Sequence, residues 1–153
     1  MSENRVYIGI DPGKNGGIAV IDGASHMVAV YSDAVLIDAA RMVADMNKAD
    51  AEAICCLEKV GAMPKQGVVS TFNFGASYGY IKGVLESFRI PYQEMPPQKW
   101  KKEFGLNSDK TASVDVCKRL FPDVNLLATP RCKKPHDGMA EALLMAEYAR
   151  RKL

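Results

Sequence analysis

Two acidic residues each end a short apolar run of the sequence. Asp11 closes RVYIGID, and Glu58 closes AICCLE. A carboxylate beside an apolar strand is costly to bury without a partner, and strand ends are where α/β sheets bind ligands. Each acid alone could be an ordinary polar residue, since aspartate is common before a turn such as Pro12–Gly13. Two strands that end in the same way make coincidence less attractive.

Asp137 and Glu141 form a second pair of acids at the start of the expected C-terminal helix. Their spacing of four places both side chains on one helical face, next to residues that should be buried. The helix dipole alone would favour acids in a first turn, but like charges along a buried edge repel each other. A divalent cation would relieve that repulsion.

The four carboxylates together make a donor set of oxygen atoms only. Hard oxygen ligands suit Mg²⁺, with Mn²⁺ as a substitute, better than zinc. Two such ions, about 3.5–4 Å apart, would hold the attacking water and the leaving oxygen of a phosphodiester. The pattern therefore predicts metal-dependent phosphodiester hydrolysis with two ions per active site.

The apolar pattern also predicts the elements that must position these acids. Strands are expected at residues 5–11, 16–22, 26–32, 53–58 and 90–95. Helices are expected from Asp33 onward, at 68–88, at 96–104, from 107–109 to 121, and from Pro135 to about 151. The first three strands form an antiparallel meander, and Pro91 favours an edge position for the last strand. This order predicts an α/β fold with a mixed five-stranded sheet, in which parallel strands extend the meander and helices flank the sheet.

Length and composition are those of an ordinary globular protein. The chain has 153 residues, of which 48% are hydrophobic and 25% charged, and a single domain over residues 1–153 is expected. No apolar run reaches the roughly 18 residues of a membrane span, and the N-terminus does not resemble a secretory signal. The four cysteines lack a CxxC pair, which argues against structural zinc and favours reduced thiols. A cytoplasmic protein without a membrane partner is expected.

The net charge of +2 conceals an asymmetry along the chain. Residues 1–58 carry nine acidic and four basic side chains, whereas residues 96–134 carry four acidic and nine basic ones. A basic stretch joined to an acidic part favours an anionic partner held near the carboxylates. Uneven surface charge without a function is the alternative.

Five segments of the sequence carry a family resemblance. They are IGIDPGKNGGIAVID, CLEKV, GASYGYIKGVLE, MPPQKWKKEFGLNSDKTAS and HDGMAEALLMAEYARR. In this order, and over nearly the whole chain, they resemble the RuvC-type crossover (Holliday) junction endodeoxyribonucleases of the ribonuclease H-like superfamily. The loop KVGAMPKQG is more similar to the phage or organellar branch than to the cellular enzymes.

The resemblance implies a ribonuclease H-like fold and a role in DNA recombination and repair. It implies that Asp11, Glu58, Asp137 and Glu141 form a metal-binding catalytic tetrad. It also implies a homodimer that cuts two opposed strands of a four-way junction. Glu141 departs from the family pattern, since many relatives have an aspartate there, often three residues after its acidic partner.

Further residues are candidates for contacts with water and DNA. His136 precedes the paired acids and could orient or deprotonate water, with a solvent-facing residue near the helix cap as the alternative. Basic residues near Trp100 and before the last helix could contact phosphates, although a solvated face is the alternative for each. These candidates are Lys14, Lys99, Lys101, Lys102, Lys110, Arg131, Lys133 and Lys134.

Gly75, Gly79 and Gly83 recur every four residues on one face of the helix expected at 68–88. Glycine costs a helix up to about 1 kcal/mol per position, so this smooth face should permit a close approach to another element. Packing in the core is one interpretation. The other is a dimer interface at which Phe72 or Phe74 stacks on an opened base pair.

These features predict a Mg²⁺-dependent, structure-selective endonuclease that resolves four-way DNA junctions by paired phosphodiester hydrolysis. A related nuclease acting on other branched DNA or on RNA–DNA hybrids is the alternative. An ATP-binding actin-like or sugar-kinase domain also opens with a GIDxG strand, but such proteins use two domains. A non-catalytic nucleic-acid-binding module would not need four carboxylates.

Overall fold

The structure is a computed structural model of the chain and describes residues 4–32, 40–41, 52–107 and 110–153. Its strands are β1 (Arg5–Asp11), β2 (Gly17–Asp22), β3 (Val28–Ser32), β4 (Glu52–Glu58) and β5 (Tyr92–Met95). Its helices are α2 (Val68–Ser87), α3 (Pro97–Glu103), α4 (Lys110–Leu120) and α5 (Asp137–Lys152). The helix expected from Asp33 falls mainly outside the described residues.

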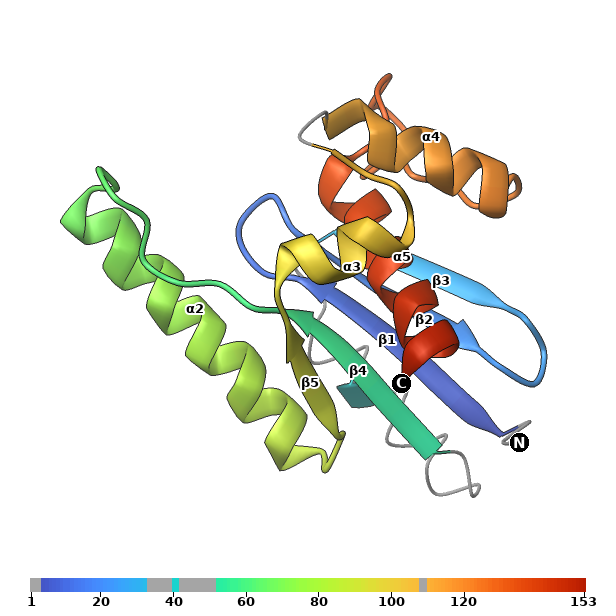
Figure 1. The fold of residues 1–153 in the computed structure, drawn as a ribbon, viewed down its shortest axis with the longest axis horizontal. Helices are drawn as coiled ribbons and strands as arrows, with labels where there is room; N and C mark the ends of the chain where they lie inside the picture. The colour runs from blue at the N-terminus through green and yellow to red at the C-terminus, as the bar shows by residue number, and fades with distance from the viewer. Residues whose placement is uncertain (1–3, 33–39, 42–51, 108–109) are drawn as a thin grey trace.

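The strands form one mixed sheet in the order β3-β2-β1-β4-β5 (Figure 1). β1 is antiparallel to β2, and β2 to β3, whereas β4 is parallel to β1 and β5 is parallel to β4. The predicted fold class is therefore confirmed, and so is the edge position of the strand after Pro91. Because β1 and β4 are parallel neighbours, their carboxyl ends reach the same edge of the sheet.

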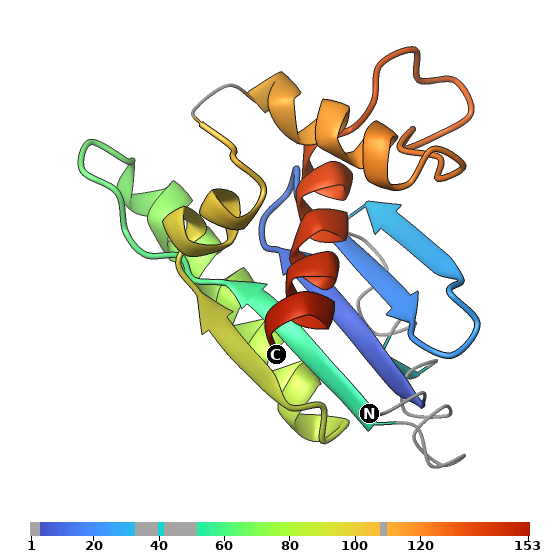
Figure 2. The same cartoon turned by 45° about the vertical axis from the view of Figure 1, so that its right-hand side comes forward.

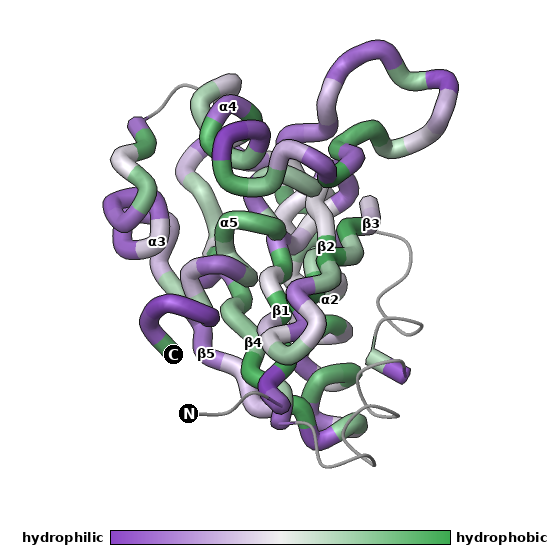
Figure 3. Tube along the Cα trace, turned by 90° about the vertical axis from the view of Figure 1, so that its right-hand side faces the viewer, coloured by the Kyte–Doolittle hydropathy of each residue, from purple (hydrophilic) through white to green (hydrophobic). Residues whose placement is uncertain are grey.

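Helices cover both faces of the sheet. Figure 2 shows α5 in front of the sheet and α2 behind it. Side chains of β1 alternate between the faces: Val6, Ile8 and Ile10 lie in the core beneath α2, while Tyr7 and Gly9 face α5. In Figure 3 hydrophobic residues gather along the strands, and the protruding loop from α4 to α5 carries several hydrophilic ones.

Helix α5 lies directly on the backbone of β1 and of the β1–β2 turn. A Cβ atom on Gly9 would lie 2.0 Å from the carbonyl oxygen of Ala142, and one on Gly138 would lie 2.1 Å from that of Asn15. A Cβ atom on Gly17 would lie 2.7 Å from the carbonyl oxygen of Gly138. Only glycine permits these approaches, so three glycines set the height of α5 above the sheet.

Helix α2 packs on the sheet only through its second half. Its buried residues are Ile81, Val84 and Leu85, and most side chains of its first half are exposed. The glycine face, formed by Gly75, Gly79 and Gly83, is exposed, and a Cβ atom on any of the three would meet nothing within 4 Å. The prediction that these glycines pack in the core is therefore wrong, because the glycine face points away from the sheet.

The start of the last helix differs from its prediction. Pro135 was expected in the first turn, but α5 begins at Asp137, and His136 is its N-cap. The proline precedes the cap, since the His136 side chain can accept a hydrogen bond from the first turn. No helix in the described part of the chain has the length and apolar character needed to cross a membrane.

The substitution Gly9→Ala should lower the free energy of unfolding by more than about 2 kcal/mol, because α5 or β1 must move to accept the methyl group. Gly61→Ala is the matched control, since a Cβ atom there would meet nothing within 4 Å. Chemical denaturation followed by circular dichroism would measure both. Equal stability of the two variants would contradict the proposed role of the contact.

Candidate active site

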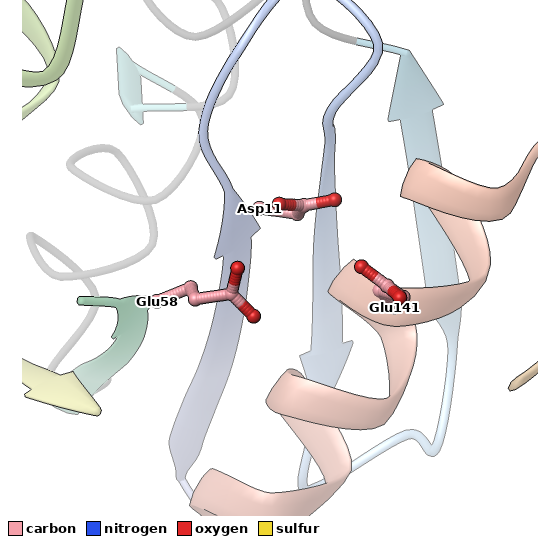
Figure 4. Close-up of side chains that lie close together, drawn as sticks. All are labelled: Asp11, Glu58 and Glu141. Carbon is pink, nitrogen blue, oxygen red and sulfur yellow. The ribbon is translucent and has the colours of Figure 1, made fainter. Parts of the chain in front are cut away.

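Three of the four predicted acids converge at the carboxyl edge of the sheet. Asp11 is the last residue of β1, Glu58 is the last residue of β4, and Glu141 lies in the second turn of α5. Their side chains point toward one another in Figure 4, and one ligand atom of each lies within 4.8 Å of the others. Glu141 joins this group although it departs from the family pattern.

These three half-buried carboxylates, the acid cluster, carry an unfavourable concentration of negative charge. Burial is the main factor that raises the pKa of Asp11 to about 9, and the charges of Glu58 and Glu141 raise it further. Burial also raises the pKa of Glu58, while a hydrogen bond from Trp100 opposes that rise. Proton uptake relieves such repulsion, and a divalent cation relieves it equally well.

Helix α3 contacts two members of the acid cluster through consecutive residues. The indole Nε1–H of the fully buried Trp100 donates a hydrogen bond of 2.9 Å to Oε2 of Glu58. Nζ of Lys101 lies 3.9 Å from Oε1 of Glu141. From the sequence, Lys101 is expected at DNA phosphates and Trp100 has no expected role.

The order of the strands and helices indicates that Trp100 lies near Glu58, which the residue types alone do not indicate. Helix α3 follows β5, and β5 is the parallel neighbour of β4. The start of α3 therefore lies beside the strand end that carries Glu58. A buried indole at this place has a carboxylate within reach of its N–H group.

Asp137, the fourth predicted acid, lies outside the acid cluster. It is the exposed first residue of α5 and lines a cavity of about 600 Å³ together with Asp11 and Glu141. The structure thus brings three of the predicted ligands within reach of one ion and places the fourth at the rim of the same cavity.

His136 caps α5, and this limits its chemistry. Its Nδ1 accepts a hydrogen bond of 3.1 Å from the backbone N–H of Met139. A neutral imidazole that accepts at Nδ1 carries its proton at Nε2. His136 could therefore donate a hydrogen bond to water in the cavity but is not set up to deprotonate it. Its water-orienting role stays a prediction.

A second cavity, of about 820 Å³, lies on the α2 side of the β1–β2 turn. Both cavities are lined by residues 11–14 and by Phe74. A Cβ atom on Gly13 would lie 3.2 Å from the Phe74 ring, and Gly13 has a φ of 118° that favours glycine. The turn therefore passes close to the ring, and the two cavities flank Asp11. Phe72, by contrast, is 75% exposed.

The predicted phosphate contacts lie on several elements around this edge. Lys101 and Lys102 line a smaller cavity beside α3. Lys110 begins α4, and its side chain falls outside the described part of the structure. The exposed candidates are Lys14, Lys99, Lys102, Arg131, Lys133 and Lys134.

Two solved structures resemble this architecture. One, of Thermus thermophilus RuvC in complex with a Holliday junction substrate, has a TM-score of 0.58 and 14% sequence identity, covering 96% of each chain. The other, of Thermus thermophilus RuvC, has a TM-score of 0.55 and 16% identity, covering 95% of this chain and 96% of that one. The chain has the RuvC fold. No protein-family model and no curated protein matches it.

In this RuvC fold, the acid cluster has the chemistry of a site for a hard divalent cation. Its ligand atoms, all within 4.8 Å of one another, are close enough for one ion to contact all three. Within the described ranges it is the one group of three or more potential metal ligands. The cluster contains neither histidine nor cysteine, which disfavours zinc.

Without metal, the thermal midpoint should fall as the pH rises from about 6 to 9. The pKa of Asp11 is raised from 3.8 to about 9, so the folded chain holds this proton more tightly than the unfolded chain. The resulting stabilisation is complete below 3.8 and is lost as the pH rises through about 9. Circular dichroism melts in EDTA would measure the slope.

Asp11→Asn should flatten this slope, because asparagine does not titrate. Asp22→Asn is the control, since Asp22 ends β2 at the opposite end of the sheet and is not part of the acid cluster. Mn²⁺ at pH 8 should raise the midpoint of the wild type far more than that of Asp11→Asn. A wild-type midpoint that stays level or rises over this pH range would contradict the raised pKa.

Proposed function

We propose that the protein is a Mg²⁺-dependent, structure-selective endonuclease that resolves four-way DNA junctions by paired phosphodiester hydrolysis. The observation that carries this proposal is the convergence of Asp11, Glu58 and Glu141, with ligand atoms within 4.8 Å of one another, at the carboxyl edge of a RuvC fold. The chain acts as one nuclease domain. Mn²⁺ can replace Mg²⁺, as it prefers the same oxygen ligands.

The proposed mechanism divides the work between the metal site and the surrounding side chains. Asp11, Glu58, Asp137 and Glu141 would hold two ions, whose chemistry would be activation of water and stabilisation of the leaving oxygen. Lys101 offsets part of the negative charge beside Glu141 and lies where it can contact a phosphate. His136 presents its Nε2–H group to water or phosphate in the same cavity.

Three observations support branched DNA as the substrate. One solved structure with this fold is described as bound to a Holliday junction substrate. Exposed lysines and an arginine lie in the turn after Asp11, on α3 and in the loop before α5, where they can neutralise phosphates. Phe74, between the two cavities, offers a ring for stacking on a base, and the exposed Phe72 is a second candidate.

A homodimer is part of the proposal, because paired cuts need two active sites and the chain supplies one. The exposed side of α2 supports this assembly. Val68, Phe72 and Tyr80 are large apolar or aromatic side chains that are more than half exposed, and they share this helix with the glycine face. Such a surface suits a second copy of the helix.

Asp11→Asn should reduce cleavage of a labelled four-way junction by several orders of magnitude, because it removes a ligand charge without changing the side-chain volume. Binding of the junction should survive. Asp22→Asn is again the matched control and should cleave like the wild type. The assay compares junction, duplex and RNA–DNA hybrid, each with Mg²⁺ and with EDTA. Undiminished cleavage by Asp11→Asn would refute the metal site, and preferred cleavage of the hybrid would favour the alternative nuclease.

Gly79→Leu should give a folded monomer, because residue 79 faces open space in the chain and the proposed partner helix in the dimer. Light scattering would report the mass, and circular dichroism the fold. Paired incisions should become single nicks or disappear. Gly61→Leu, at another open position, is the control and should remain dimeric. A dimeric and fully active Gly79→Leu protein would contradict this interface.

A further inference from the structure

We propose that Trp100 is a positioning residue for the metal site: its indole N–H group holds the Glu58 carboxylate in the orientation that binds a divalent cation. The inference rests on the proposed metal-dependent function and deepens it. It stands on the 2.9 Å hydrogen bond from Nε1 of Trp100 to Oε2 of Glu58. Trp100 is also the one tryptophan of the chain, so its fluorescence should report occupation of the site.

Packing alone does not explain a tryptophan at this position. Trp100 is 0% exposed and lies in the core between the sheet, α3 and α5, where phenylalanine would fill space without a polar group. A buried indole N–H group must find an acceptor, since leaving it unpaired costs about 1–3 kcal/mol. The acceptor of the Trp100 N–H group is Glu58, so the hydrogen bond that the buried indole needs is made to a member of the acid cluster.

The hydrogen bond from Trp100 constrains Glu58, which has the longer side chain of the two acids at the strand ends. Glu58 has one more rotatable bond than Asp11, and the negative charge of Glu141 repels it. An ionised acceptor strengthens such a bond roughly twofold relative to a neutral one. Because α3 is held by the core, the indole gives the Glu58 side chain a fixed anchor on the side away from α2.

Lys101 does not supply the same constraint. Its Nζ lies 3.9 Å from Glu141, which is an ion-pair distance rather than a hydrogen bond, and the side chain is about one-third exposed. The ammonium group can therefore move to a phosphate while the indole stays in place. Metal ligands commonly depend on such outer partners, and loss of a partner typically lowers metal affinity about 10–100-fold.

The test measures Mn²⁺ binding by calorimetry in the full-length protein, without DNA. Trp100→Phe keeps a buried aromatic ring but has no donor, and it should weaken Mn²⁺ binding about 10–100-fold. Tyr92→Phe is the matched control, because it removes a hydrogen bond of 2.8 Å from another aromatic donor to Glu86, remote from the acid cluster. It should bind Mn²⁺ like the wild type.

A double-mutant cycle separates positioning from general loosening of the core. Glu58→Gln removes the ligand charge that Trp100 positions. If Trp100 acts through Glu58, adding Trp100→Phe to Glu58→Gln should weaken Mn²⁺ binding by less than twofold further. Fully additive losses would overturn the proposal, because they would place the effect of Trp100 elsewhere in the core.

A second replacement addresses the risk that Trp100→Phe fails to fold. With one tryptophan in the chain, biosynthetic incorporation of 3-benzothienylalanine changes position 100 alone and exchanges the N–H group for sulfur in a ring of similar shape. This protein should fold like the wild type and show the same loss of Mn²⁺ affinity. In the unlabelled wild type, Mn²⁺ should quench Trp100 fluorescence with the Kd found by calorimetry.

The outcomes distinguish this inference from the proposed function. A wild-type protein that binds no Mn²⁺ would overturn the metal site and the role of Trp100 together. Wild-type binding that Trp100→Phe or benzothienylalanine leaves unchanged would overturn the role of Trp100 alone. Reduced Mn²⁺ affinity, with junction cleavage that recovers at high Mn²⁺ concentration, supports both.

Discussion

The geometry of the acid cluster depends on the direct contact between α5 and the backbone of the sheet. Gly9, Gly17 and Gly138 leave room for the closest backbone approaches in this contact, so the helix lies low against β1, β2 and the β1–β2 turn. Glu141 can reach the carboxylates at the strand ends only because the helix lies this low. The contact also accounts for the half-burial of the cluster, because α5 lies beside the strand ends on one face of the sheet.

The three carboxylates of the acid cluster repel one another, and two residues of α3 reduce this repulsion. A proton on Asp11, an indole donor for Glu58 and an ammonium group near Glu141 each reduce the repulsion in the absence of a metal ion. The proton, the indole and the ammonium group differ in whether they can leave the cluster. Under the proposed function, a bound cation would displace the proton and Lys101 would move to a phosphate, whereas the buried Trp100 would stay in place.

Much of the fold and part of the site could be predicted from the sequence. The apolar runs that end in Asp11 and Glu58 predicted two strands of a mixed sheet, but the sequence did not show that these two strands are parallel neighbours. Helical spacing placed Asp137 and Glu141 on one face, but it could not show that Glu141 reaches the cluster and Asp137 the rim, since that depends on the height of α5. The bond from Trp100 was missed because it joins residues 42 positions apart through tertiary packing. The glycine face of α2 was recognised, but its direction depends on which turns of the helix touch the sheet.

The pairing of β1 with β4 restricts where residues can be inserted or deleted in proteins with this fold. Ile10 pairs with Leu57, so the acid after each of them points to the α5 side of the sheet. Insertion of one residue within either strand would turn its terminal carboxylate through the sheet toward α2, and the acid cluster would lose that member in a single step. Insertions after the strands carry no such penalty. Length changes should therefore accumulate in the segment from Lys59 to Gly67 and in the loop before α5, while the two strands keep a constant count from their first residue to their acid.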